Sequence, residues 1–234
     1  MSIDRDDEEI AVARVGALNV GRPQTLGREG AADPFDQAWT TGIFKTPVDG
    51  PVRLARLGFE GDGQADLTVH GGPDKAVCVY SADHYPGWRR ALGMDRFTFG
   101  AFGENLTIEG LDEAQVCIGD VWSLGNALVE ISQPRQPCWK LAQKWRRRTL
   151  TDEVASSGRT GWYFRVLREG TVTAGDILFL VDRPHPEWSV AAANHVMHRR
   201  EGDAAALASL KSLSASWRHT LERRLQASKR GTAS

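Results

Sequence analysis

The stretch VCIGDVWSLGNALVEISQPRQPCWK, from Val116 to Lys140, contains the pattern that decides the fold class. Two apolar runs follow each other in it, and Gly119 and Asp120 stand where a tight turn precedes a strand. Similar short runs recur between turn residues from position 12 to about 181: RVGALNV, PVRLARLGF, KAVCVY and GDILFLV. Brief runs rich in Val, Ile, Leu and Phe predict a β-rich domain built as a barrel or sandwich.

Helical patterns interrupt these runs at two places. SADHYPGWRRALG, from Ser81 to Gly93, begins with a capping residue and ends in glycine. PCWKLAQKWRRR, from Pro137 to Arg148, has apolar residues near helical spacing and arginines at its end. Proline at the first helical position would place Cys138 in the opening turn, where the helix dipole lowers the pKa of a thiol.

The character of the sequence changes after VDRPHPEW, where Pro184 and Pro186 mark a linker. Three segments then each start with a Ser or Asp cap and continue with helical periodicity: SVAAANHVMHRR, DAAALASLKS and SASWRHTLERRLQAS. We therefore expect a β-rich α+β chain: a disordered lead-in at 1–11, a β domain at 12–183 and a three-helix unit at 188–228.

Composition narrows the class of protein. The 234 residues carry 29 Lys and Arg against 30 Asp and Glu, a net charge of -1, and 41% of them are hydrophobic. The sequence therefore lacks the excess of positive charge that is typical of proteins that bind nucleic acid or an anionic membrane. The sequence has no apolar run of transmembrane length, and its start, MSIDRDDEEI, is acidic where a signal peptide is basic. We expect a cytoplasmic globular protein.

The three cysteines differ in their surroundings. Cys78 and Cys117 lie in apolar strand-like runs, where a cysteine acts as a small hydrophobic residue. Cys138 lies in a polar stretch after a strand, close to Arg135. It is either a buried structural thiol or a reactive or metal-binding thiolate. Without CxxC spacing or a paired histidine, the sequence gives no zinc motif.

Several loops carry further candidate residues. HGGPDK, with His70, Gly71, Gly72 and Lys75, can bind an anion through backbone N–H groups and the lysine, or it is a tight hairpin. FGENL offers Glu104 and Asn105 to a polar ligand or to the backbone around them. Lys45 and Arg159 lie in loops where they either contact an anion or face solvent. The preceding stretch EGDGQAD, with Glu60, Asp62 and Asp66, is interpreted as an acidic turn on a solvated surface.

These motifs in their order resemble the signature of the MOSC family, closest to its YiiM-like branch, which includes the 6-N-hydroxylaminopurine resistance proteins. The matching blocks are TGIF, EGDGQADLTVHGGPDKAV, FGENL, CIGD, QPRQPCWKLA and SGRTGWYFRVL. The resemblance covers about residues 12–183, and the helices that follow resemble the small helical unit of this branch. It implies a β-barrel that handles the molybdenum cofactor.

The resemblance also implies roles for single residues. The cysteine of the PC pair is the expected molybdenum ligand, which here is Cys138, and a soft thiolate suits that metal. The phosphate of the cofactor would be contacted by Lys45, Lys75, Arg135 and Arg159. The rest of the pocket would be lined by His70, Gly71, Gly72, Glu104 and Asn105.

The implied activity is the reduction of N-hydroxylated bases or related compounds to amines, a detoxification step in which a protonated His70 could help water to leave. Electrons would come from a separate donor protein, since no flavin, haem or iron–sulfur motif is apparent. The alternative is a carrier that passes molybdenum cofactor or sulfur to another enzyme. In some proteins of the family a MOSC domain is fused to a pyridoxal-phosphate-dependent sulfurase. Pyridoxal phosphate is not expected here, because this sequence lacks the large additional domain that such an enzyme needs. The apolar faces of the C-terminal helices suit either a homodimer or packing on the barrel.

Overall fold

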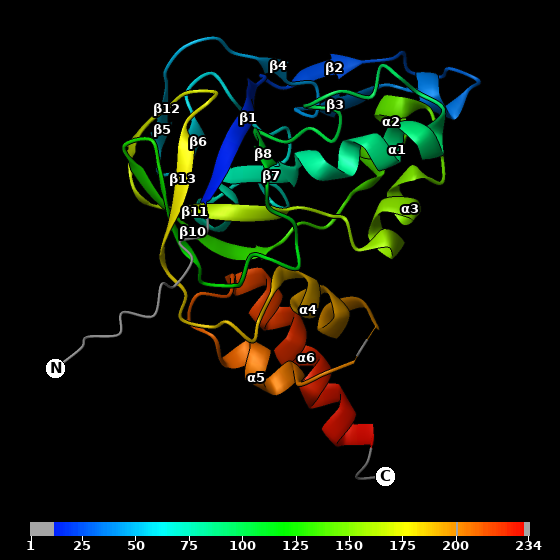
Figure 1. The fold of residues 1–234 in the computed structure, drawn as a ribbon. Helices are drawn as coiled ribbons and strands as arrows, with labels where there is room; N and C mark the ends of the chain where they lie inside the picture. The colour runs from blue at the N-terminus through cyan, green and yellow to red at the C-terminus, as the bar shows by residue number, and fades with distance from the viewer. Residues whose placement is uncertain (1–11, 200, 232–234) are drawn as a thin grey trace, which may run out of the picture.

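The computed structural model describes residues 12–199 and 201–231, so the expected lead-in at 1–11 lies outside the described residues. Its centre is a closed barrel of seven strands (Figure 1). Around the ring, the strands are β1 (Val12–Val20), β13 (Ile177–Asp182), β9 (Val121–Leu124), β10 (Ala127–Pro134), β11 (Trp162–Arg168), β7 (Val77–Ser81) and β8 (Leu106–Glu109). Pairing of β1 with both β13 and β8 closes the ring, and β7 with β8 is its parallel pair. The predicted β-rich barrel is confirmed.

Alternating side chains fill the barrel. On β13, Leu178 points into the core, whereas its neighbours Ile177 and Phe179 are exposed. The two strands that pair with β13 contribute further buried side chains, such as Val15 on β1 and Trp122 on β9. A register shift between Val15 and Ala17 marks a bulge in the pairing of β1 with β8, while residues 12–14 also pair with β13.

Two expectations about the strands are wrong in detail. PVRLARLGF forms two strands, β5 (Val52–Ala55) and β6 (Gly58–Phe59), which pair as a hairpin and extend through β12 (Gly170–Val172). Gly58, the first residue of β6 after the turn, has a φ of +134°, which favours glycine. Cys117 lies before β9 and makes an isolated bridge with Ser189 rather than belonging to a strand.

Smaller elements lie between these strands. Near the N-terminal end they are β2 (Gln24–Leu26), a 3-10 helix (Pro34–Asp36), β3 (Trp39–Thr41) and β4 (Thr46–Pro47). Two further 3-10 turns, Pro73–Lys75 and Ala82–His84, flank β7. The second of them leads directly into the first α-helix.

Three helices lie together beside the barrel in Figure 1: α1 (Tyr85–Leu92), α2 (Trp139–Trp145) and α3 (Leu150–Ser157). The helix predicted from Ser81 to Gly93 is confirmed as a 3-10 turn followed by α1. Ser81 Oγ accepts from Asp83 N–H at 3.2 Å, and Gly93 ends the helix at φ 63°. These helices and the loop before β8 enclose a second apolar cluster that includes Trp88, Phe102 and Leu141.

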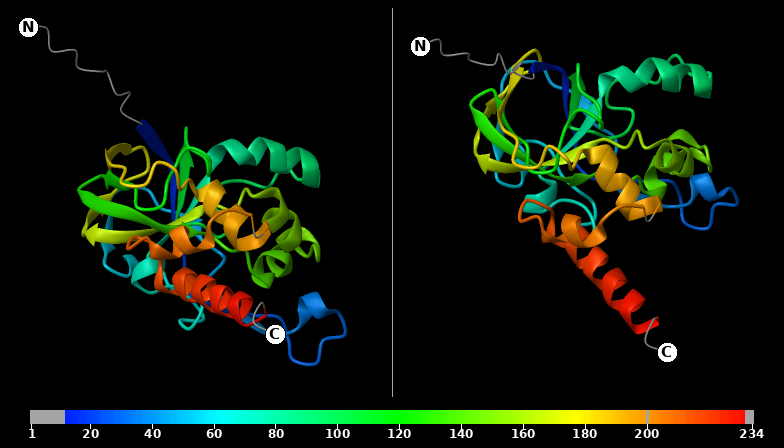
Figure 2. Two further views of the ribbon diagram at one scale, coloured as in Figure 1. Left: turned by 90° about the horizontal axis from the view of Figure 1, so that it is seen from below. Right: turned by 60° about the horizontal axis from the view of Figure 1, so that its bottom comes forward.

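The C-terminal helices pack against the lower end of the barrel and extend away from it (Figures 1 and 2). They are α4 (Val190–Asn194), which continues as a π-helical segment (His195–Arg199), α5 (Ala204–Ser209) and α6 (Ala215–Gly231). All three predicted caps are confirmed. Ser189 accepts from Ala192 N–H at 3.0 Å, Asp203 from Ala205 and Ala206, and Ser214 from Trp217 at 3.3 Å. Among the described helices, we find none that combines the length and apolar character needed to cross a membrane.

Candidate functional site

A pocket of about 640 Å³, including the part open to solvent, lies where the HGGPDK loop, the FGENL loop and the QPRQPC stretch meet. Most of the residues predicted from the sequence line it: Lys45, His70, Gly71, Lys75, Asn105, Arg135 and Cys138. Gly72, Glu104 and Arg159 do not belong to the lining.

Cys138 lies directly before α2, with extended backbone angles of φ -117° and ψ 165°. The helix begins at Trp139, so the expectation that Pro137 is its first residue, with Cys138 in the opening turn, is wrong. The Cys138 carbonyl accepts from Leu141 N–H at 3.0 Å and from Thr151 Oγ1 at 3.1 Å. These two bonds fix the backbone, while the half-buried thiol lines the pocket.

Arg135 is 6% exposed and lines the same pocket. Its Nη2 donates to the Phe102 carbonyl at 2.6 Å, and its backbone N–H donates to the Gly161 carbonyl at 2.9 Å. Its Nη1 is buried and finds no hydrogen-bond acceptor within residues 12–199 and 201–231. Burial opposes the charge, but Cys78, Tyr163 and Cys138 outweigh it and raise the pKa of Arg135 above its ordinary value. The pocket therefore holds a cation with an unused donor.

The HGGPDK loop adds positive charge to one wall. Lys75 Nζ donates to the Val69 carbonyl at 2.8 Å, and burial lowers the pKa of this lysine. Burial, followed by the charges of Lys140 and Lys75, lowers the pKa of His70 from 6.5. The lowered pKa favours the neutral form of the His70 imidazole in the ligand-free protein, and the protonated His70 expected during catalysis stays a prediction.

The Lys45 charge is balanced within the protein. Its Nζ forms an ion pair with Asp62, and the two side chains are 6% and 2% exposed. Asp62 also accepts from Gly21 N–H and from Asn105 Nδ2, each at 2.9 Å. The interpretation of Asp62 as part of a solvated acidic turn is thus wrong, because its buried carboxylate accepts from four donors, the fourth being Gln64 Nε2 at 3.5 Å.

Asn105 connects this ion pair to the barrel. Its Oδ1 accepts from Cys78 N–H at 3.1 Å, and its Nδ2 also donates to the Asn19 carbonyl at 3.2 Å. The side chain therefore supports backbone from two strands while it lines the pocket. Both sequence-based alternatives for this residue, lining the site and fixing the backbone, are met.

Three predicted residues lie elsewhere. Glu104 is fully buried and accepts from Gly100 N–H at 2.7 Å, Phe102 N–H at 3.1 Å and the Thr107 hydroxyl at 2.8 Å, and also from the Tyr85 hydroxyl. It braces the loop that presents Phe102. Arg159 is exposed, and its backbone carbonyl accepts from the Tyr80 hydroxyl at 2.9 Å. Gly72, at φ 80°, precedes the 3-10 turn, and its carbonyl accepts from Lys75 N–H at 3.0 Å.

Several lining residues were missed by sequence reasoning. Cys78 was interpreted as a packing residue, and it is 9% exposed, yet it lines the pocket beside Tyr163. Burial raises the pKa of the Cys78 thiol, and the Tyr163 hydroxyl is within hydrogen-bonding reach of it. Tyr163 faces Cys78 across the β7–β11 pair. This register is not visible in the sequence, where the two residues are far apart.

The lining is positively charged overall. Its charged side chains are Lys45, Lys75, Arg135 and Lys140, and among the described lining residues none is an aspartate or a glutamate. Since Asp62 balances Lys45, the remaining three cations face the pocket around the two thiols and neutral His70. Such an arrangement favours an anionic ligand.

Comparison with known proteins places the chain in a family. Residues 66–178 match the MOSC domain, and residues 188–227 match the YiiM-like, 3-alpha helix domain. YflK of Bacillus subtilis (strain 168) is 48% identical over 205 residues, which cover 86% of this chain and 90% of YflK. The crystal structure of YiiM from Geobacillus stearothermophilus superposes with a TM-score of 0.75 at 41% identity, covering 91% of this chain and 99% of that one.

A third relative is longer than this chain. It is a protein named reductase from Gibberella moniliformis (strain M3125 / FGSC 7600), 40% identical over 164 residues. The match covers 69% of this chain but 29% of that protein. The domain matches, the YflK identity and the YiiM structure together show that the chain belongs to the MOSC domain family, in its YiiM-like branch.

Proposed function

We propose that the pocket binds the molybdenum cofactor, with Cys138 as the protein ligand of the metal, and that the loaded protein reduces N-hydroxylated compounds to amines. The observation that carries the proposal is the buried, unpartnered Nη1 of Arg135 in a pocket shared with the Cys138 thiol. Leaving a charged donor unpaired in the interior costs free energy, which an anionic ligand offsets.

The residues present fit such a group. A pterin cofactor brings a phosphate, which suits the planar donors of Arg135 and the amines of Lys75 and Lys140. It also supplies its own sulfur ligands, so a single protein thiolate completes the coordination. Cys138 meets this need because its backbone is pinned while its thiol lines the pocket.

The overall reaction is R–NHOH + 2 electrons + 2 protons → R–NH₂ + H₂O. When bound, the cofactor would supply the two-electron chemistry and accept the substrate oxygen. The protein would orient the substrate, and His70, neutral without ligand, would gain basicity once an anion balances Lys75 and Lys140. It could then hold one of the protons that the departing water needs.

Electrons would come from a separate donor protein. The longer relative named reductase supports this arrangement, since the segment similar to this chain is 29% of its length. Its remaining sequence has room for other modules, whereas in this chain the described residues form the barrel and its helices.

The test begins with purification from a host that makes the cofactor. Molybdenum and pterin are measured per chain in the wild type, in Cys138→Ser and in Cys117→Ser, a control thiol that is 3% exposed and outside the pocket lining. We expect near-stoichiometric metal in wild type and Cys117→Ser, and its loss in Cys138→Ser. Reduction of an N-hydroxylated base is then followed with an electron-donor system.

The outcomes separate the alternatives. Bound cofactor with turnover supports the enzyme. Bound cofactor without turnover that passes to a molybdenum-dependent apo-enzyme supports the carrier, and the reductase proposal then fails. Wild-type protein that contains neither metal nor pterin contradicts both.

A further inference from the structure

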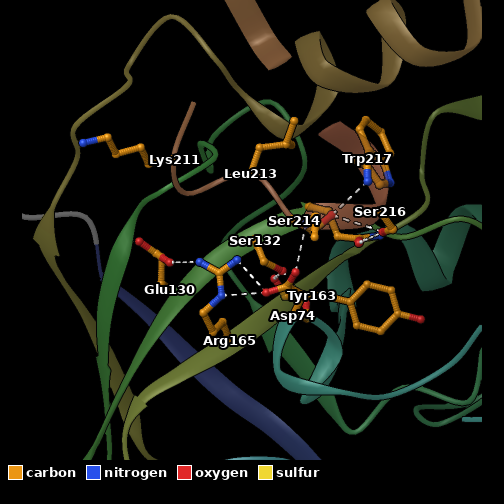
Figure 3. A network of polar contacts seen from close by, with 12 residues as sticks. Asp74, Glu130, Ser132, Tyr163, Arg165, Lys211, Leu213, Ser214, Ser216 and Trp217 are labelled. Carbon is orange, nitrogen blue, oxygen red and sulfur yellow. Dashed lines mark hydrogen bonds and ion pairs between the residues drawn. The ribbon is translucent and has the colours of Figure 1, made fainter. Parts of the chain in front are cut away.

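Asp74 lies next to Lys75 in the HGGPDK loop but does not belong to the pocket lining, and its carboxylate takes part in a polar network (Figure 3). Asp74 Oδ1 accepts two hydrogen bonds from Arg165, from Nε at 2.9 Å and from Nη2 at 2.6 Å. Arg165 in turn pairs with Glu130. The two barrel strands β10 and β11 thus hold one side of this carboxylate.

The other side of Asp74 is held by the C-terminal helices. Asp74 Oδ2 accepts from the backbone N–H of Ala215, the first residue of α6, at 3.0 Å. Beside it, Ser214 N–H donates to the Ser132 carbonyl at 2.9 Å, and the Ser132 hydroxyl donates to the Asp74 carbonyl at 2.5 Å. The start of α6 is therefore joined to the HGGPDK loop directly and through β10.

A short chain of contacts continues from Asp74 to the pocket. The 3-10 turn Pro73–Lys75 places Lys75, the next residue, in the pocket lining. Lys75 Nζ binds the Val69 carbonyl at 2.8 Å, directly before His70 and Gly71. The turn that places Lys75 in the pocket lining therefore also contains Asp74, whose side chain binds the start of α6.

We propose that Asp74 is a positioning residue through which the C-terminal helical unit holds Lys75 and His70 in place for anion binding. The helical unit is then part of the site's construction, although the residues that line the pocket come from the chain before it. The inference rests on the proposed function in one respect: it takes this pocket as the place where an anion binds.

Electrostatics and positioning predict opposite effects of neutralising Asp74. Burial lowers the pKa of Lys75 and the Asp74 charge partly opposes this shift, so the two groups interact. If geometry stayed the same, Asp74→Asn would make the pocket more positive and more attractive to anions. If Asp74 holds the loop, its loss displaces Lys75, and anion attraction falls although a negative charge has been removed.

Ala215→Pro separates the two effects without changing any charge. It removes the N–H that donates to Asp74, and proline is favoured at the first position of a helix. Ala215 is exposed, so the ring has space. The matched control is Ala204→Pro at the first position of α5, where Asp203 accepts from Ala205 and Ala206 rather than from Ala204.

The measurement uses the full chain without cofactor. Cys138 is alkylated with iodoacetate, an anion, and with iodoacetamide, its neutral analogue, and both rates are read at the Cys138 peptide by mass spectrometry. The ratio of the iodoacetate rate to the iodoacetamide rate reports anion attraction at the thiol. Changes in thiol exposure affect both rates and cancel in the ratio. A urea unfolding curve for each variant confirms that the protein is folded under the reaction conditions.

We expect Ala215→Pro and Asp74→Asn to lower this ratio by about threefold. A focused positive field raises the encounter rate of an anion by about tenfold or more, and a displaced Lys75 would remove part of that gain. Ala204→Pro should keep the wild-type ratio. An unchanged ratio in Ala215→Pro, a raised ratio in Asp74→Asn or an equal fall in Ala204→Pro overturns the inference. If Asp74→Asn does not fold, Ala215→Pro decides alone. Since no cofactor is used, failure to find molybdenum in the purified protein would leave this test unaffected.

Discussion

At the scale of single residues, Arg135 is the main reason for proposing an anionic ligand in this pocket. A buried guanidinium that lacks an acceptor for Nη1 is rare in native proteins, because an unmet charged donor costs free energy. The backbone carbonyl of Phe102 holds the buried side chain in place, away from solvent. The fork is thereby preorganised for a planar or phosphate-like anion.

His70 gives a pH dependence whose sign can be worked out. Its pKa is lowered in the folded protein by burial and by Lys140 and Lys75, whereas Asp66 acts in the opposite direction. As pH falls through 6.5, the unfolded chain takes up the proton before the folded protein does, so stability is lost from that pH downward. We expect His70→Gln to lose less stability than wild type over this range, in urea unfolding at several pH values.

The same titration can be followed directly. The His70 ring proton in an NMR titration should show a midpoint below 6.5, and added inorganic phosphate should move it upward as the anion balances the two lysines. A midpoint at or above 6.5 without phosphate would contradict the description of the ligand-free pocket.

The residue scale also shows where sequence reasoning succeeds. Cys138 and Arg135 stood out because a proline-rich polar stretch after a strand is an unusual place for them, and both line the pocket. Cys78 was missed because a cysteine within an apolar run has the same local pattern whether it faces a core or a cavity. Asp62 was misjudged because burial of a carboxylate depends on partners from distant segments, here Gly21 and Asn105.

At the scale of elements, the loop from β6 to the HGGPDK turn is tied down at Asp62. We expect Asp62→Asn to destabilise the protein by about 3–5 kcal/mol, because it leaves the buried Lys45 charge uncompensated. The midpoint of urea unfolding measures this loss. The pocket should lose anion attraction together with the displaced Lys45 and Asn105.

The matched control for this prediction is Asp66→Asn, the same substitution in the same loop. Asp66 accepts from Thr68 N–H at 3.0 Å and from the Thr68 hydroxyl at 2.6 Å, all within one exposed turn. Its unfolding midpoint should stay close to that of wild type. Equal losses from the two substitutions would show that the Lys45–Asp62 pair is not what holds this loop.

Element boundaries were the least predictable feature. PVRLARLGF has a strand-like composition throughout, and its division into β5 and β6 depends on the pairing of β5 with β12 on one side and with β6 on the other. The start of α2 was placed too early because proline suits a first helical turn, yet Cys138 keeps extended angles. The caps at Ser189, Asp203 and Ser214 were predictable because a cap is a local interaction.

For the whole molecule, the sequence pattern predicted strands but not the closure of the barrel. The pairing of β1 with β13 joins Val12 to Phe179, and periodicity carries no information on contacts so far apart. The barrel, as distinct from a sandwich, was expected on the resemblance to the MOSC family alone. The three-helix unit followed from composition and caps, while its attachment to the site through Asp74 depends on tertiary contacts.

The barrel and the helical unit share one apolar cluster, which makes the chain cooperative as a whole. Side chains of the C-terminal helices, among them Val190, Leu207 and Trp217, belong to the same buried cluster as Val15 and Trp122 of the barrel. We therefore expect a single unfolding transition in urea, with coincident curves from far-UV circular dichroism and tryptophan fluorescence.

Leu207→Ala tests this cooperativity from the helical side. Leu207 is fully buried in α5, so its truncation should cost about 2–5 kcal/mol, and it should shift both curves by the same amount. The Cys138 alkylation rate reports the barrel separately, and it should rise at the same urea concentration as the two spectroscopic transitions. If Leu207→Ala instead produced an early transition in circular dichroism while Cys138 kept its native rate, the helical unit would unfold by itself. The pocket would then be built by the barrel alone, and the positioning role of α6 would have no physical basis.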